Sequence, residues 1–115
     1  MQILSEQTCI SCSSRSKSVT DEIITELKPQ IPEWGIIIQD GERRLQRTYL
    51  FSNFQKALAF TQLVGEAAEI EGHHPSLLTE WGKVTATWWT HAIKGLHRND
   101  FIMAAKSDHI YTKYI

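Results

Sequence analysis

Apolar and polar residues alternate most strictly over residues 83–91. One face of this segment would carry Val84, Ala86 and Trp88, and the other Thr85, Thr87, Trp89 and His91. Because successive side chains of a strand point to opposite faces, the pattern predicts a half-buried β-strand. A shorter strand is predicted just before it, over residues 77–79, with Trp81 and Gly82 turning the chain between the two strands.

A second pair of strands is predicted earlier in the chain. The run over residues 34–39 is apolar and β-branched, and Asp40 and Gly41 follow it. This dipeptide is typical of a type I′ turn, in which both positions need positive φ. The chain then returns over residues 43–51 with Leu45, Tyr49 and Phe51 on one face and Arg44, Gln46 and Thr48 on the other. These features predict a β-hairpin.

Two segments before residue 72 have the three- and four-residue apolar spacing of helices. The first follows Thr20 as a candidate N-cap and is ended by Pro29. The second begins at a predicted capping box, Ser52–Gln55, and runs to about Glu69. Gly72 then breaks it.

A third helix is predicted to start near residues 97–99, with Phe101, Ala104 and Ala105 facing inward. The predicted order is helix, strand, strand, helix, strand, strand, helix (α-β-β-α-β-β-α). Paired hairpins with helices between them favour an α+β fold, in which three helices pack on one face of a four-stranded antiparallel sheet. The other sheet face and the edges would remain uncovered, so we expect a homo-oligomer.

Composition limits the function classes. A chain of 115 residues with 42% hydrophobic residues suits one domain, which we expect over residues 19–115 after a flexible N-terminal arm, 1–18. The net charge of -1 does not favour direct nucleic-acid binding. No apolar run approaches the roughly 20 residues of a membrane span, and no secretion signal is recognisable. We therefore expect a cytoplasmic protein without membrane contact.

Cys9 and Cys12 form a C-x-x-C pair beside a Ser-rich stretch. A redox role would need a helix N-terminus in a βαβ setting, and a zinc site would need a second such pair. We expect the pair to be an incidental feature of the arm, with metal binding and redox use as the alternatives.

Candidate chemistry gathers at His73-His74-Pro75 and at His91. These histidines could be hydrogen-bonded structural residues, or they could bind zinc, which accepts three imidazoles and a water. Adjacent histidines in an extended segment point in opposite directions, however. Because the pKa of imidazole is near 6.5, the same side chains could instead take a proton from one substrate atom and give one to a departing hydroxyl. His97 and His109 are expected to be surface groups.

The spacing of these residues resembles the pterin-4a-carbinolamine dehydratase family. The matching pattern comprises Glu69, three residues, His73-His74-Pro75, five residues, Trp81, nine residues, His91, eight residues and Asp100. The likeness extends over about residues 18–112 and includes Trp34, Leu45-Gln46-Arg47 and Gly95-Leu96.

The resemblance implies a hydro-lyase that converts 4a-hydroxytetrahydropterin to quinonoid dihydropterin and water, and so recycles the pterin of aromatic amino-acid hydroxylases. It implies no metal and no cofactor, a homodimer or homotetramer, and a functional link to such a hydroxylase. His73 and His91 would be the acid–base couple, and His74 would orient the substrate. The implied substrate-binding positions are Gly72, Pro75, Trp89, Thr90, Ala92, Glu69, Asp100 and Trp34.

Several of these positions have a structural alternative. Glu69 could be a solvated residue at a helix end, and Asp100 could accept backbone amides at the start of the last helix. Trp34 and Trp81 could be core or turn aromatics. The chain also departs from many relatives, which carry an acidic residue at the position of Gly72 and a Ser or Thr helix cap at the position of His97. Trp88-Trp89 is bulkier than usual and would narrow the pocket.

Two other functions fit the same residues. One is a non-enzymatic dimerisation or assembly partner built on this scaffold, and the other is a metal-binding domain to which Cys9 and Cys12 contribute. The three intact histidines argue against a pure scaffold, which would not need them.

Overall fold

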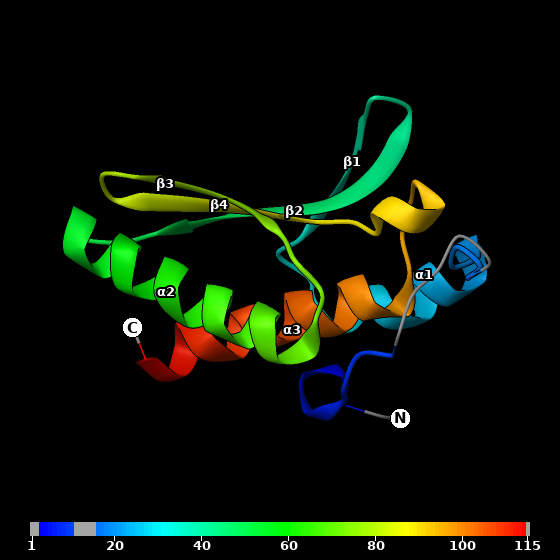
Figure 1. Cartoon of the computed structure of the whole chain (residues 1–115), viewed down its shortest axis with the longest axis horizontal. Helices are drawn as coiled ribbons and strands as arrows, with labels where there is room; N and C mark the ends of the chain where they lie inside the picture. The colour runs from blue at the N-terminus through cyan, green and yellow to red at the C-terminus, as the bar shows by residue number, and fades with distance from the viewer. Residues whose placement is uncertain (1–2, 11–15, 115) are drawn as a thin grey trace.

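The computed structural model describes residues 3–10 and 16–114. Its elements are η1 (Leu4–Glu6), α1 (Asp21–Leu27), η2 (Lys28–Gln30), β1 (Gly35–Gln39), β2 (Glu42–Leu50), α2 (Phe54–Glu71), β3 (Ser76–Glu80), β4 (Lys83–Trp88), η3 (His91–Ile93) and α3 (Arg98–Tyr114). The strands form one antiparallel sheet in the order β1-β2-β4-β3, and the helices lie on one face of it (Figure 1). The predicted α+β fold and element order are confirmed.

The first hairpin forms as its turn residues require. Gln39 pairs with Glu42, which leaves Asp40 and Gly41 as a two-residue turn. Their φ angles are 53° and 76°, the left-handed values that a type I′ turn needs. The turn therefore fixes the register of β1 against β2.

The core lies between the sheet and the helices. The inward face of the sheet contributes Leu45, Tyr49, Val84, Ala86 and Trp88, and α2 contributes Ala57, Phe60, Val64 and Ala68. On α2 these residues are three or four positions apart, so they share one face of the helix. The faces predicted from alternation are confirmed at these positions.

Two predicted boundaries were wrong. The N-cap of α2 is Asn53, not Ser52, because the Asn53 side chain accepts the backbone N–H of Lys56 at 2.8 Å. The last strand, β4, ends at Trp88, so His91 lies in the short 3-10 helix η3 rather than in a strand. A bridge between Thr90 and Gly95 closes the loop that carries His91.

The described part of the predicted arm makes specific contacts with the domain. Leu4 is completely buried in the hydrophobic core, and its N–H donates to Gln30 Oε1 at 2.9 Å. Cys9 is half-buried, whereas Cys12 lies outside the described residues. The division into arm and domain stays a prediction, but residues 3–10 are packed against α3. Within the described ranges, no helix combines the length and apolar character needed to cross a membrane.

Candidate active site

The end of α2 places the adjacent histidines. Gly72 caps the helix in the left-handed conformation, with φ 65°, which favours glycine. Its N–H is directed to the carbonyls of Ala68 and Glu69, and the N–H of His73 donates to Ala68 at 3.2 Å. The backbone of His73 is therefore fixed to the last turn of the helix, and Gly72 has a clear structural role as the C-cap of α2.

The adjacent histidines after α2 and the histidine in η3 line a single cavity of about 190 Å³. Glycine, aromatic and small residues complete its lining. Its lining consists of Gly72, His73, His74, Trp89, Thr90, His91 and Ala92. All seven residues are among the site residues expected from the sequence. The cavity is smaller than the roughly 300 Å³ at which pockets for drug-sized ligands begin, so it suits a small ring system or one end of a larger ligand.

Asp100 is completely buried and does not line the cavity, but it bonds to His73 and Thr90, which do. Its Oδ1 is 2.6 Å from His73 Nε2, and its Oδ2 accepts the Thr90 hydroxyl at 2.8 Å and the backbone N–H of His97 at 2.9 Å. A carboxylate surrounded by donors accepts only, so we assign the His73 proton to Nε2. The imidazole also stacks on Trp88, with ring centroids 5.8 Å apart and planes 9° apart. These contacts hold the ring in one orientation and leave Nδ1 able to accept a proton.

His74 has a different environment. Its Nε2 is 2.5 Å from Glu69 Oε1, five residues earlier in the chain. The two side chains are 60% and 79% exposed, and exposed ion pairs contribute little to stability. His74 can therefore change its orientation more easily than His73.

The third histidine lies beside Trp89, with the two ring centroids 4.6 Å apart. The guanidinium carbon of Arg44 lies 3.9 Å from the centroid of the Trp89 ring. Arg44 is only 8% exposed, although alternation had placed it simply on the polar face of its strand. The pairing of Leu45 with Trp88 brings Arg44 next to Trp89, so register between distant strands is the signal that could have revealed it.

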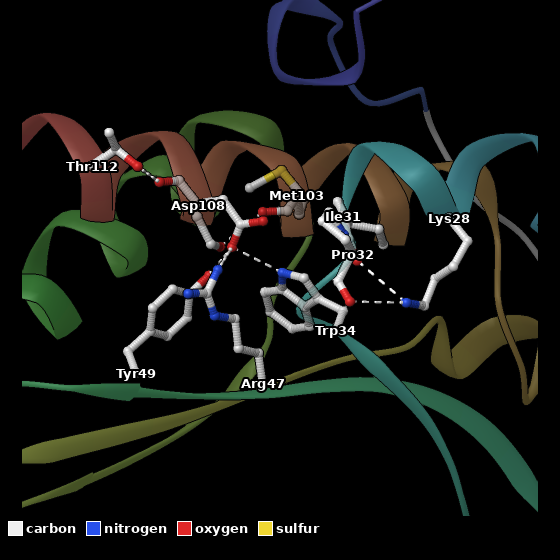
Figure 2. A network of polar contacts seen from close by, with 10 residues as sticks. Lys28, Ile31, Pro32, Trp34, Arg47, Tyr49, Met103, Asp108 and Thr112 are labelled. Atoms are coloured by element: carbon white, nitrogen blue, oxygen red, sulfur yellow. Dashed lines mark hydrogen bonds and ion pairs between the residues drawn. The ribbon is translucent and has the colours of Figure 1, made fainter.

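Four expected site residues do not line the cavity. Glu69 and Asp100 reach it through their contacts with histidines, and Pro75 lies just before β3. Trp34 is 1% exposed and its Nε1 donates to Asp108 at 2.9 Å, in a separate polar network between β2 and α3 (Figure 2). The structure therefore places Trp34 in the core, in agreement with its structural alternative. Trp81 is 72% exposed in the turn between β3 and β4.

The expectation that His97 is a surface group was wrong. His97 is buried and precedes the first residue of α3, where its Nδ1 accepts the N–H of Asn99 at 3.0 Å. His97 thus caps α3, and Asp100 accepts the His97 N–H as the acidic partner of a capping box. Burial, with a smaller effect of His73, lowers the pKa of His97, and Asp100 opposes this. His109 is exposed, as expected.

A larger hollow of about 600 Å³ lies between α2 and β3, and its lining shares Glu69 with the histidine site. It contains no histidine, so it lacks groups that transfer protons near neutral pH. Across residues 3–10 and 16–114, no three His, Cys, Asp or Glu side chains are placed to hold one metal ion. The histidine cavity is therefore the candidate for chemistry.

Comparisons with known proteins agree on one family. The family model described as pterin 4 alpha carbinolamine dehydratase matches residues 16–110. A protein of Microcystis aeruginosa named "Putative pterin-4-alpha-carbinolamine dehydratase" is 58% identical over 111 residues, which are 96% of each chain. A crystal structure described as a transcriptional coactivator/pterin dehydratase from Brucella melitensis aligns with a TM-score of 0.74 and 26% identity, over 82% of this chain and 98% of that one.

The fold is thus that of the carbinolamine dehydratase class of α+β proteins. This chain belongs to the pterin 4 alpha carbinolamine dehydratase family. The resemblance read from the spaced histidine pattern is confirmed.

Proposed function

We propose that this protein dehydrates 4a-hydroxytetrahydropterin to quinonoid dihydropterin and water. The observation that carries the proposal is the convergence of His73, His74 and His91 on one cavity, with buried Asp100 bonded to the first of them. Family membership supplies the class of substrate. The same family resemblance supports a role in recycling the pterin of aromatic amino-acid hydroxylases, in a homodimer or homotetramer.

The reaction removes a proton from a ring nitrogen and breaks the bond between C4a and its hydroxyl oxygen. In our proposal Nδ1 of His73 accepts the nitrogen proton, because Asp100 holds the other ring nitrogen as a donor. The carboxylate would also stabilise the imidazolium that forms. His91 gives a proton to the hydroxyl, which leaves as water. Solvent then restores both histidines, so the substrate loses one proton and one hydroxide in total.

His74 and Trp89 are assigned to binding in this proposal. His74 is exposed at the mouth of the cavity and paired with Glu69, so it can turn toward a bound pterin and orient it. Trp89 supplies an aromatic wall beside His91. Gly72, Thr90 and Ala92 complete the lining, as the family resemblance implies for substrate-binding positions.

A stopped-flow assay on freshly prepared 4a-hydroxytetrahydropterin tests the proposal. The wild-type protein should speed the loss of water above the spontaneous rate, and His73→Ala should lower kcat about 100-fold or more. His109→Ala is the matched control, because His109 is an exposed histidine on α3 outside the cavity. Wild-type protein that leaves the spontaneous rate unchanged would overturn the enzyme assignment and favour the non-enzymatic binding partner instead.

A further inference from the structure

The N-terminal segment follows α3 toward the histidine site. In Figure 1 the dark blue segment with η1 lies beside α3. Leu4 is buried in the core, Lys106 Nζ donates to the Ser5 carbonyl at 3.1 Å, and Arg98 Nε donates to Gln7 Oε1 at 3.1 Å. The segment is therefore attached to α3 from Lys106 to the first turn of the helix.

The last described residues of this segment join the two parts of the chain that carry His73 and Asp100. The N–H of Cys9 donates to Glu71 Oε1 at 2.6 Å, and Glu71 is the last residue of α2. The backbone of Ile10 makes two bonds with the Asn99 side chain, of 3.1 Å and 2.7 Å. Glu71 precedes His73 by two positions and Asn99 precedes Asp100 by one, so the segment spans the His73–Asp100 pair.

We propose that residues 3–10 act as a strap that holds His73 and Asp100 in register, and that Glu71 and Asn99 are positioning residues for the dehydration. The inference rests on the proposed function, in which His73 accepts the proton. The strap lies outside residues 16–110, the part that the family model matches. It is therefore a feature that the family pattern does not describe.

The physical reason is the sensitivity of the His73–Asp100 bond to geometry. The two groups come from different elements, one after the end of α2 and the other in the first turn of α3. Helix ends open more readily than helix centres, and a misplacement of about 1 Å in a catalytic group can cost about 100-fold in rate. A segment bonded to both ends limits their relative movement, so the imidazole keeps its orientation and tautomer.

Glu71→Ala and Asn99→Ala are the test variants. Each should lower kcat about tenfold while KM changes less than about twofold, since the strap does not touch the cavity. Glu71→Gln keeps an oxygen acceptor for the Cys9 N–H and should retain wild-type kcat. Glu66→Ala, an exposed acidic residue on the same helix, is the matched control. Amide hydrogen exchange at Cys9 and Ile10 reports whether the strap has been released.

A second readout does not depend on activity. In ¹⁵N imidazole spectra, wild-type His73 should show the Nε2–H tautomer with slow proton exchange, and the alanine variants should show mixed tautomers and faster exchange. If the wild-type protein lacks dehydratase activity but these spectra change as expected, the strap stands and the proposed function fails. If exchange at Cys9 and Ile10 shows release while the His73 spectrum and kcat remain those of the wild type, the strap is overturned. The melting temperature of each variant identifies any that unfolds. If Asn99→Ala unfolds, Asn99→Asp replaces it, because this variant keeps the acceptor for the Ile10 N–H and loses only the donor to the Ile10 carbonyl.

Discussion

His73 and Asp100 are 27 positions apart in the sequence, yet Nε2 of the first lies 2.6 Å from Oδ1 of the second. The pair joins the end of α2 to the start of α3. Asp100 serves both the imidazole and the backbone N–H of His97, so one buried carboxylate starts a helix and orients a candidate catalytic group. The structural alternative for Asp100 and its proposed site role are therefore compatible.

Replacement of Asp100 by asparagine separates these roles. The backbone N–H of His97 can only donate, so the amide oxygen of Asp100→Asn should stay on that side and the amide NH2 should face His73. The His73 proton should then shift from Nε2 to Nδ1. We expect Asp100→Asn to lower kcat by roughly 100-fold or more, because the nitrogen that should accept a proton is then protonated. Stopped-flow kinetics measure the loss, and ¹⁵N imidazole spectra report the tautomer.

Thr90→Val is the companion variant for this prediction. It removes one donor to Oδ2 of Asp100 but leaves the His73 bond in place. Its effect on kcat should be clearly smaller than that of Asp100→Asn. Equal losses in the two variants would show that general disturbance of the carboxylate, not the tautomer of His73, controls the rate.

His97 should make stability depend on pH. Burial and the neighbouring His73 lower its pKa from the ordinary 6.5, although Asp100 acts in the opposite direction. Below about pH 6.5 the unfolded chain therefore binds a proton that the folded chain does not. The free energy of unfolding should keep its full value above that pH. It should fall as the pH decreases from there toward the lower pKa of His97 in the folded chain.

Urea unfolding at about pH 7.5 and about pH 5.5 tests this prediction on either side of the histidine titration. His97→Asn retains a cap for α3 without a titrating group, so its stability should fall less on acidification than that of the wild type. His109→Asn should keep the wild-type dependence because His109 is exposed. An unchanged dependence in His97→Asn would assign the acid sensitivity to other groups.

Local patterns were enough to predict the sheet and the first hairpin. The Asp40-Gly41 turn and the alternation over β4 depend on neighbouring residues, so the sequence alone reveals them. The positions that the family resemblance implied include every residue that lines the cavity. Burial of polar groups could not be predicted in the same way. Arg44 and His97 are buried by contacts with residues distant in the sequence or by a cap that is not the usual residue type.

The packing of the N-terminal segment illustrates the same limit. The sequence predicted a flexible arm over residues 1–18, and no pattern in it indicated which of its residues contact the domain. Leu4 nevertheless fills a place in the core, and Cys9 and Ile10 bond to side chains that are 62 and 89 positions away. No short-range pattern encodes such contacts, because they depend on where the folded domain leaves acceptors and space.

Tyr49 gives an alkaline counterpart to the His97 prediction. Its hydroxyl donates to Asp108 Oδ1 at 2.5 Å, and the same oxygen accepts bonds from Arg47 and Trp34 (Figure 2). Burial, followed by the charge and hydrogen bond of Asp108, raises the pKa of Tyr49 far above its ordinary 10.0. The contribution of the Tyr49 phenol to the free energy of unfolding is fully present below about pH 10. It is lost as the pH rises further, because the phenol of the unfolded chain ionises first.

Tyr49→Phe should lower the free energy of unfolding at neutral pH by about 1.5–3 kcal/mol, the range for a hydrogen bond to a charged group. The difference from the wild type should narrow above about pH 10, since the variant has no phenol to ionise. Tyr114→Phe removes an exposed phenol and should match the wild type at both pH values. A difference that stays constant at all pH values would mean that ionisation of the Tyr49 phenol does not cause the loss of stability above about pH 10.

Arg44 should influence substrate affinity through Trp89. Its guanidinium lies 3.9 Å from the Trp89 ring centroid and is paired with Glu42 at 3.2 Å. Arg44→Lys keeps the charge but loses the planar group that stacks on the indole. Cation–π contacts contribute about 0.5–2 kcal/mol, so the aromatic wall beside His91 should become less fixed. We expect KM for the pterin to rise about two- to tenfold, with kcat within about twofold of the wild type.

Arg43→Lys is a suitable control, because the neighbouring arginine is exposed and pairs with Asp21 instead. Steady-state parameters from stopped-flow traces over a range of substrate concentrations separate the two effects. If Arg44→Lys lowers kcat while KM stays constant, Trp89 acts on the chemical step and not on binding. Because Trp89 touches His91, that result would indicate that Arg44 helps to place the proton donor, and His91→Asn combined with Arg44→Lys should then show no further loss.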